Sequence, residues 1–416
     1  MNIKIPYGSE EISLSIGRNP VILAVPDRSG AVSSDQAFEG EIARLKGEWD
    51  CKKSNLIIIN DADRSTPTAK VFDRILTLLK ETPKLKILVA CGTHSMPKDE
   101  EMRAVLGKYY DYFREKIFFH HSKDNESLKY SGKTSRGTEV WLNKLVFECE
   151  RVLAIGSLEP HYFAGLTGGR KAFLPGIAGY ISIEMNHKLA LEEGSQPLAL
   201  AGNPVHEDMD EALNFLDLSR VRSFQMVDVP GKGIVGASYG GIRESFYDLA
   251  DLAKESFSYD VAEKAEIAVT AAVPPLDKNL YQAQKAVENV VAGVKDGGII
   301  IWVSACFSGI GGTHFFEHLV SRTPDEIIED VKKNFKLGWQ KSGRMARNLK
   351  RFKIFLVSQM DTGALSQTGI KGYRDLKSAL AAALTEKGAD ARVLIVPRGS
   401  ETAVTYRTSG PLSNTA

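Results

Sequence analysis

Short apolar runs alternate with helical patterns along most of this 416-residue chain, and this alternation constrains the fold more than any other feature. Short runs of this kind are typical of buried strands, and proline at the start of a segment is typical of a helix's first turn. The alternation predicts a mostly parallel sheet covered by helices. In the first part of the chain the predicted strands are 21–25, 56–59, 87–90, 116–119 and 152–155, and the helices are 67–79 and 97–106.

The same pattern restarts after a connecting segment at residues 256–264. Because a chain of this length is too long for one ordinary core, we predict two α/β domains. The first covers residues 1–258 and the second, smaller one covers 259–398, while the polar residues 399–416 form a tail or return to the first domain. The predicted strands of the second domain are 267–270, 298–303, 353–357 and 392–396, and its helices are 280–292, 324–335, 339–349 and 373–386.

Composition excludes several classes of protein. The 53 basic and 52 acidic side chains nearly cancel, which argues against a nucleic-acid-binding protein. The longest apolar runs are far too short to span a membrane, and the N-terminus lacks the apolar core of a signal peptide. The four cysteines are scattered without a CxxC motif, so we expect them to be reduced and the protein to be cytoplasmic. They are Cys51, Cys91, Cys149 and Cys306.

The segment EPHYFAGLTGGRKAFLPGIAGYISIEMNH, after the last predicted strand of the first domain, holds the densest group of candidate site residues. A loop at the carboxyl end of such a strand is where α/β sheets bind ligands. Gly168 and Gly169 allow the backbone to approach a phosphate, and Lys171 can neutralise that phosphate or bond covalently to a cofactor. His161 and His187 can supply a proton carrier and a metal ligand. The alternative is a surface loop with two incidental histidines.

Two further loops of the first domain carry polar side chains between a predicted strand and a proline-led helix. In DADRSTPT, Asp61, Ser65 and Thr66 accompany Arg64, which can bind a carboxylate or phosphate at the helix N-terminus. The alternative there is a capped helix with a surface Arg64–Asp61 pair. The next loop, CGTHSMP, places His94 in the corresponding position. Because carboxyl ends of parallel strands share one edge, three such loops favour a site over coincidence.

In the second domain, Gln282 and Lys285 are three residues apart and share one face of a predicted helix. Near the helix N-terminus, that face can hold a carboxylate. The alternative is a solvated first turn of the helix.

Taken together, the motifs DADRSTPT, CGTH, EPHYFAGLTGGRK, MNH and LYQAQK resemble those of the nickel-pincer-nucleotide-dependent lactate racemase family along essentially the whole chain. The resemblance implies two α/β domains with an active-site cleft between them. It also implies a nickel-pincer nucleotide, which is a pyridinium-3,5-bisthiocarboxylic acid mononucleotide. Its nickel is bound by one ring carbon, two sulfurs and a protein histidine.

The resemblance also implies roles for individual residues. Lys171 is the covalent attachment site, His187 the nickel ligand, and His94 and His161 the acid/base pair. Arg170, next to Lys171, is expected to affect substrate or phosphate recognition. The residues implied to bind substrate are Arg64, Gln282, Lys285, Asp61 and Trp339, and those implied around the cofactor are Gly168, Gly169, Ser65 and Thr66.

The implied reaction is racemisation of a 2-hydroxy acid, with lactate as the default substrate, by reversible hydride transfer through a 2-keto acid. Moving a hydride avoids the carbanion that proton abstraction beside a carboxylate would require. Two histidines are expected because the two enantiomers present their hydroxyl groups differently. Partner enzymes must synthesise the cofactor. The alternatives are a racemase or epimerase for a longer hydroxy acid, such as malate or an aldonate, and a non-catalytic nucleotide-binding protein.

Overall fold

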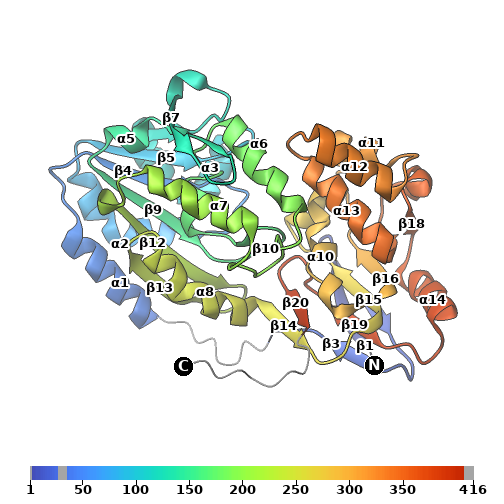
Figure 1. Ribbon diagram of the computed structural model, residues 1–416. Coiled ribbons are helices and arrows are strands. Elements are labelled where there is room, and N and C mark those ends of the chain that lie inside the picture. The colour runs from blue at the N-terminus through green and yellow to red at the C-terminus, as the bar shows by residue number, and fades with distance from the viewer. Residues whose placement is uncertain (1, 27–34, 407–416) are drawn as a thin grey trace, which may run out of the picture. The chain divides into compact units, whose positions relative to one another are not determined.

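The computed structural model describes residues 2–26 and 35–406 and divides the chain into two compact units. We call residues Arg28–Ser256 the central unit. We call residues Met1–Asp27 with Phe257–Ala416 the terminal unit, because it contains both ends of the chain. Each unit is an α/β domain built on a six-stranded sheet, which confirms the predicted fold class (Figure 1).

The central sheet has the strand order β13-β12-β9-β4-β5-β6. Its neighbouring strands are parallel except β13, which runs antiparallel to β12. Parallel strands end at a common edge, so the loops after β4, β5 and β9 emerge together. The strands are β4 (Asn55–Asn60), β5 (Leu85–Ala90), β6 (Ile117–Phe119), β9 (Arg151–Ser157), β12 (Val221–Val229) and β13 (Gly233–Gly240).

Four helices bury their apolar side chains against one face of the central sheet. In α2, for example, Val71, Phe72, Ile75 and Leu79 recur at helical spacing and are fully buried. The four are α1 (Asp35–Glu48), α2 (Thr68–Lys80), α3 (Asp99–Leu106) and α4 (Tyr109–Phe113). Later in the chain come α6 (Tyr180–Lys188), α7 (Pro204–Ala212) and α8 (Glu244–Phe257).

The terminal sheet has the strand order β18-β17-β16-β15-β19-β3, and all its neighbours are parallel. One face packs against α14 (Leu376–Lys387) and the hairpin of β1 (Asn2–Tyr7) and β2 (Glu10–Ser15). The strands are β3 (Val21–Leu23), β15 (Ala265–Ala271), β16 (Val294–Val303), β17 (Lys353–Val357), β18 (Ile370–Tyr373) and β19 (Val393–Val396).

The opposite face of the terminal sheet carries short helices that hold predicted substrate residues. Side chains alternate between the two faces of a strand, so Thr270 of β15 points away from α14. Its hydroxyl donates a hydrogen bond to the carbonyl of Ala286 in α10. The helices are α9 (Leu280–Ala283), α10 (Lys285–Glu288), α11 (Thr313–Leu319), α12 (Pro324–Asn334) and α13 (Trp339–Arg351). The single helix predicted over 280–292 is therefore replaced by two short helices and a 3-10 turn, Val291–Gly293.

The unit boundaries differ from the predicted ones at both ends of the chain. Strand β3 pairs with β19, so the first residues of the chain belong to the terminal unit and not to the first domain. Near the other end, β20 (Ala403–Tyr406) pairs with β14 (Ser258–Val261) of the terminal unit. Residues 407–416 of the expected tail lie outside the described residues. An apolar run predicts a strand but does not specify its neighbour, so the sequence pattern placed residues 21–25 in the first domain although β3 pairs with β19.

Among the described residues, no helix is both long enough and apolar enough to cross a membrane. All four cysteines are free.

The packing of the N-terminal hairpin generates a prediction about stability. Ile5 is fully buried in the core that includes Ile267 and Ile299, so Ile5→Ala is expected to destabilise the terminal unit by about 2–5 kcal/mol. Chemical denaturation measures this loss. The control is Ser13→Ala, at an exposed position of β2. Equal stabilities of the two variants would show that the hairpin contributes little to this core.

Candidate active site

Glycines shape the loop that leaves β9 and carries His161 and Lys171. The chain forms a small hairpin, in which His161 in β10 (Pro160–His161) pairs with Gly165 in β11 (Gly165–Leu166), and then a 3-10 turn, Gly169–Ala172. Gly165 has a φ of 74°, and a Cβ there would lie 2.0 Å from the carbonyl oxygen of Ala199. No other residue type fits this position without displacing backbone.

Lys171 is buried close to other positive groups. Burial lowers the pKa of its amine well below the usual value, and the Arg64 and Arg170 guanidiniums lower that pKa further. A lower pKa increases the fraction of the amine that is uncharged, and the uncharged form is the nucleophile. Arg64 comes from the loop after β4, so the structure brings two of the predicted motifs together around this amine.

His187, on α6, belongs to the same neighbourhood. Burial lowers the pKa of its imidazole to about 3, and the nearby Lys171 and His94 contribute to that shift. Its Nδ1 atom is buried and makes no hydrogen bond. Phe163 packs edge-on against both predicted histidines, with its ring centre 5.1 Å from that of His187 and 4.5 Å from that of His161. His187 is thus a neutral imidazole beside the backbone of Ile183.

His94 is held by two carboxylates from the loop after β4. Its Nδ1 lies 2.7 Å from Asp61 Oδ2 and 3.3 Å from Asp63 Oδ2. Asp61 is nearly buried, whereas Asp63 and His94 are about half exposed. A carboxylate on Nδ1 keeps the proton of the neutral ring there, leaving Nε2 as an acceptor. The alternative Arg64–Asp61 surface pair does not occur among the described ion pairs, because Asp61 pairs with His94.

The hydrogen bond to His161 places the proton of the neutral ring on the other nitrogen than in His94. The backbone N–H of Ala164 donates to its Nδ1 at 3.2 Å, so the proton of the neutral ring lies on Nε2. The side chain is buried and stacks on Tyr162. The two predicted acid/base histidines therefore start from complementary states, with Nε2 an acceptor in His94 and a donor in His161.

The remaining residues of the DADRSTPT loop have separate environments. The Thr66 hydroxyl accepts from Asn60 Nδ2 at 2.6 Å and lies 2.8 Å from Ser157 Oγ, which ties the end of β4 to the end of β9. Ser65 is exposed.

Arg170 is buried and faces the loop interior. Its Nη2 donates to the carbonyls of Ala164 at 2.8 Å and Leu166 at 3.1 Å, and its guanidinium lies 4.5 Å from the centre of the Phe246 ring. Nε and Nη1 make no hydrogen bond, and burial lowers the pKa of this side chain to about 9. Arg170 therefore connects the turn that carries Lys171 to the hairpin that carries His161.

Three predicted substrate residues lie in the terminal unit. Gln282 is in α9, whose first turn is capped because Asn279 Oδ1 accepts from the Gln282 N–H at 2.9 Å. Lys285 begins α10, and Trp339 begins α13 with its ring 4.0 Å from that of His318. Both Gln282 and Lys285 are partly exposed.

Sequence reasoning missed three residues that shape the site in the central unit. Asp63 contacts His94, Phe163 contacts two histidines, and Gln225 Oε1 accepts from the Gly169 N–H at 3.0 Å. Asp63 lies within DADRSTPT and Phe163 within EPHYFAGLTGGRK, so these motifs could have indicated both residues. Gln225 lies in β12, and no motif in the surrounding sequence indicates a functional role for it.

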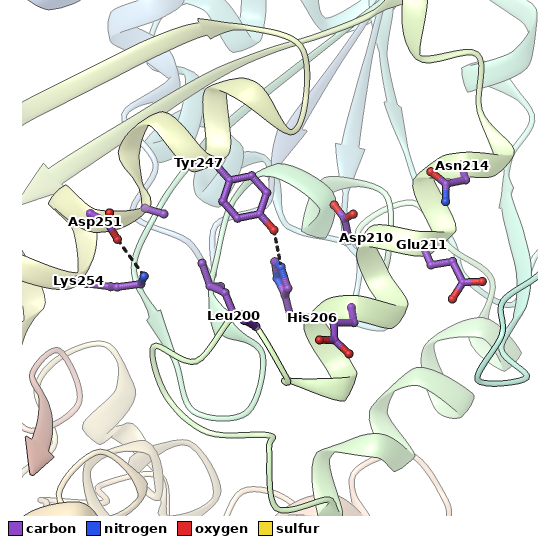
Figure 2. A pocket seen from close by; sticks show the side chains of 11 residues that line it. Leu200, His206, Asp210, Glu211, Asn214, Tyr247, Asp251 and Lys254 are labelled. Carbon is purple, nitrogen blue, oxygen red and sulfur yellow. Dashed lines mark hydrogen bonds and ion pairs between the residues drawn. The ribbon is translucent and has the colours of Figure 1, made fainter. Parts of the chain in front are cut away.

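A separate hollow of about 550 Å³ lies between α7 and α8 of the central unit (Figure 2). Figure 2 shows Tyr247 directed at His206, whose Nε2 is 3.0 Å from the tyrosine hydroxyl. Four of its eleven lining residues are acidic, namely Glu207, Asp210, Glu211 and Asp251. It contains none of the predicted site residues, so we do not assign it to the reaction.

Comparisons with known proteins decide the family. Residues 7–198 match the lactate racemase N-terminal domain, and residues 261–404 match the lactate racemase C-terminal domain. The chain belongs to the lactate racemase family. Lactate racemase of Lactiplantibacillus plantarum is 30% identical over 83% of this chain and 84% of its own length. Lactate racemase of Thermoanaerobacterium thermosaccharolyticum is 28% identical over 96% of this chain and 98% of its own.

Solved structures agree with this assignment. The lactate racemase apoprotein from Thermoanaerobacterium thermosaccharolyticum superposes with a TM-score of 0.86 at 26% identity, covering 97% of this chain and 100% of that one. A protein from Thermotoga maritima, at 16% identity and a TM-score of 0.70, shares the fold over 90% of this chain and 98% of its own. Family membership confirms the predicted class of enzyme, an isomerase acting on a hydroxy acid.

The Asp61–His94 contact generates a prediction about turnover. Asp61→Asn removes the charge that holds Nδ1–H of His94, so kcat for racemisation is expected to fall on the order of 10²–10⁴-fold. The control is Asp63→Asn, where an exposed pair worth at most about 1 kcal/mol predicts a change of roughly fivefold or less. Chiral chromatography on equally loaded proteins measures both rates. Similar losses in the two variants would contradict a special role for Asp61.

Proposed function

We propose that this chain racemises a 2-hydroxy acid, with lactate as the default substrate, using a nickel-pincer nucleotide attached to Lys171. The observation that carries the proposal is the buried Lys171 beside Arg64, Arg170 and His187, with an amine pKa that burial and the two guanidiniums lower. A surface loop with incidental histidines would not bury a lysine among other cations. A non-catalytic nucleotide-binding protein would not need the oppositely held His94 and His161.

The residues of the central unit fit the proposed cofactor. An uncharged amine is the form of Lys171 that can form a thioamide linkage to the cofactor. His187 offers a neutral imidazole, and its buried Nδ1 makes no hydrogen bond. Neutral imidazole is a suitable ligand for nickel. The guanidinium of Arg64 near this amine suits a cofactor that carries a phosphate and other anionic groups.

When bound, the cofactor supplies an acceptor and donor for the hydride at substrate C2. The protein's own residues move the hydroxyl proton and orient the acid. Nε2 of His94 is free to accept that proton, and the Asp61 carboxylate then stabilises the imidazolium. Nε2–H of His161 donates a hydrogen bond to the oxygen of the 2-keto acid in its other orientation. For His161 to accept a proton at Nε2, its ring must leave the Ala164 N–H.

Positive side chains are proposed to bind the substrate carboxylate. We assign this role to Arg64, and the family resemblance assigns it also to Lys285, with Gln282 donating from its amide. Charge-assisted contacts of this kind hold the acid while its C2 changes configuration. The same residues serve any 2-hydroxy acid, so the choice between lactate and a longer acid rests on other side chains.

The attachment of the cofactor gives a test that does not depend on turnover. Lys171→Ala is expected to abolish the covalent mass increase and the activity while the fold remains, because no other residue supplies this amine. Intact-mass analysis after coexpression with the cofactor-synthesising enzymes measures the adduct. The control is Lys188→Ala, at an exposed lysine of α6, which should keep the adduct.

A companion variant separates the metal from the organic group. His187→Ala should lose nickel, measured by elemental analysis, while keeping the mass increase on Lys171. A normal adduct in Lys171→Ala would sink the attachment proposal, and full nickel content in His187→Ala would remove His187 as a ligand.

The route taken by the C2 hydrogen tests the reaction itself. Substrate deuterated at C2 is expected to give a product that largely retains deuterium, because a hydride that stays in the site does not exchange with water. Mass spectrometry of the product in light water measures the retention, and rapid quenching should reveal a 2-keto acid. Complete loss of deuterium to water without any keto acid would establish direct proton abstraction instead.

A further inference from the structure

Helix α13 of the terminal unit buries an unusually polar face. Most residues in its first half are buried, among them Gln340, Lys341, Ser342 and Arg344. Buried polar side chains are retained when their hydrogen bonds are satisfied. Here Lys341 and Arg344 have partners on α9 and α10, whereas Ser342 bonds to Trp339 of its own helix and to His318 of α11. The helix therefore packs by polar contacts against the segment that carries Gln282 and Lys285.

An ion-pair network fixes α13 to α10. Glu288 is almost fully buried and accepts from Arg344 Nη2 at 2.6 Å and from Asn348 Nδ2 at 2.9 Å. Gln284 Nε2 donates to the Lys341 carbonyl at 2.9 Å. With both charges paired and the remaining oxygens bonded, this network holds the two helices in a fixed register.

Lys341 extends this connection to α9. Its side chain is 8% exposed, its Nζ donates to the Tyr281 carbonyl, and Nζ lies 4.1 Å from the centre of the Tyr281 ring. Tyr281 directly precedes Gln282 in the chain. One buried ammonium group thus binds both the backbone and the ring of the residue next to a proposed substrate contact.

We propose that Lys341 is a positioning residue that holds the Tyr281–Lys285 segment in place for carboxylate binding. The proposal rests on the carboxylate role given above to Lys285. Arg344 and Glu288 position the same segment from the α10 side, but their charges are paired with each other. Lys341 differs because its charge is bound by a carbonyl and a ring.

The charge of Lys341 is also poised to change near neutrality. Burial lowers its pKa to about 7, the Glu288 carboxylate opposes this shift, and the Lys285 cation adds to it. Around it, α10 contributes Glu288 and Lys285, α13 itself contributes Arg344, and α9 contributes the Tyr281 phenol. His318 of α11 reaches α13 at Ser342.

The sign of the resulting pH effect follows from these charges. Below pH 7 Lys341 is protonated and adds positive potential beside Lys285, and above pH 7 that potential is lost. An anionic ligand near Lys285 favours the protonated form, so its binding should draw a proton onto Lys341. Carboxylate binding is therefore expected to be tighter at pH 6.5 than at pH 8.5.

The test uses the loaded holoenzyme and 2-hydroxyisobutyrate, which has the carboxylate and hydroxyl of a 2-hydroxy acid but no hydrogen at C2. Calorimetry in buffers of different ionisation enthalpy measures both the Kd and the protons taken up, without turnover. We expect the wild-type protein to take up part of a proton between pH 7 and 8. Lys341→Gln keeps a donor for the Tyr281 carbonyl but should lose this uptake and bind about fivefold more weakly at pH 6.5, as expected for the loss of one nearby charge worth about 1 kcal/mol.

Two more variants separate positioning from general stability. Lys341→Met, which lacks both donor and charge, should bind more weakly still at every pH. Lys350→Gln, on the same helix but in an exposed pair with Asp325, should leave Kd and proton uptake unchanged. If Lys341→Met fails to fold, the comparison of wild type with Lys341→Gln still decides.

The proposal is overturned if Lys341→Gln retains wild-type proton uptake and Kd, or if it lowers only the melting temperature. Absence of any binding of 2-hydroxyisobutyrate to the wild type would also overturn it. Binding with Lys341-dependent proton uptake in a protein that racemises no 2-hydroxy acid would support Lys341 and refute the proposed function. Unchanged binding in Lys285→Ala would refute the carboxylate role on which the proposal rests.

Discussion

Burial of positive charge beside a glycine-shaped loop is the constraint on which the central unit depends. The guanidinium of Arg170 is buried away from water, and its Nε and Nη1 atoms make no hydrogen bond. Isolated burial of a charge costs several kcal/mol, and a desolvated cation–π contact such as that with Phe246 recovers about 2 kcal/mol of it. The two carbonyls of the hairpin offset a further part. The charged guanidinium of Arg170 thus holds the loop in place.

This arrangement sets the chemistry of the neighbouring residue. Burial, together with the field of Arg64 and Arg170, lowers the pKa of the Lys171 amine, and burial together with the Lys171 charge lowers the pKa of His187. Gly168 lets the loop lie against the Ser157 carbonyl at the end of β9, and Gly165 lets the hairpin lie against the backbone of Ala199. The backbone geometry of the loop thus buries the charged groups, and their burial in turn makes the Lys171 amine more nucleophilic.

Sequence patterns predicted nine of the twelve strands in the two six-stranded sheets, because apolar runs such as those of β4, β5 and β9 exceed any competing local preference. They also predicted that three loops would meet, because parallel strands end at one edge. The neighbour of β3 could not be predicted, since strand pairing over more than 350 residues, here Val21 with Val393, leaves no local trace. The break in the predicted helix 280–292 was missed because Gln284, which bonds to α13, is an ordinary helix-forming residue.

The sequence could name Lys171, His187, His94 and His161 but not their states. Protonation depends on desolvation and on neighbours that the fold supplies, such as Asp61 for His94 and the Ala164 N–H for His161. The same reasoning separates the two buried lysines. Lys171 has two cations as neighbours and is driven toward the neutral, nucleophilic form, whereas Lys341 has Glu288 nearby and stays close to its midpoint at neutral pH. A lysine near its midpoint gains a proton when an anion binds close to it, so the charged neighbours, and not burial alone, give these two buried lysines different roles.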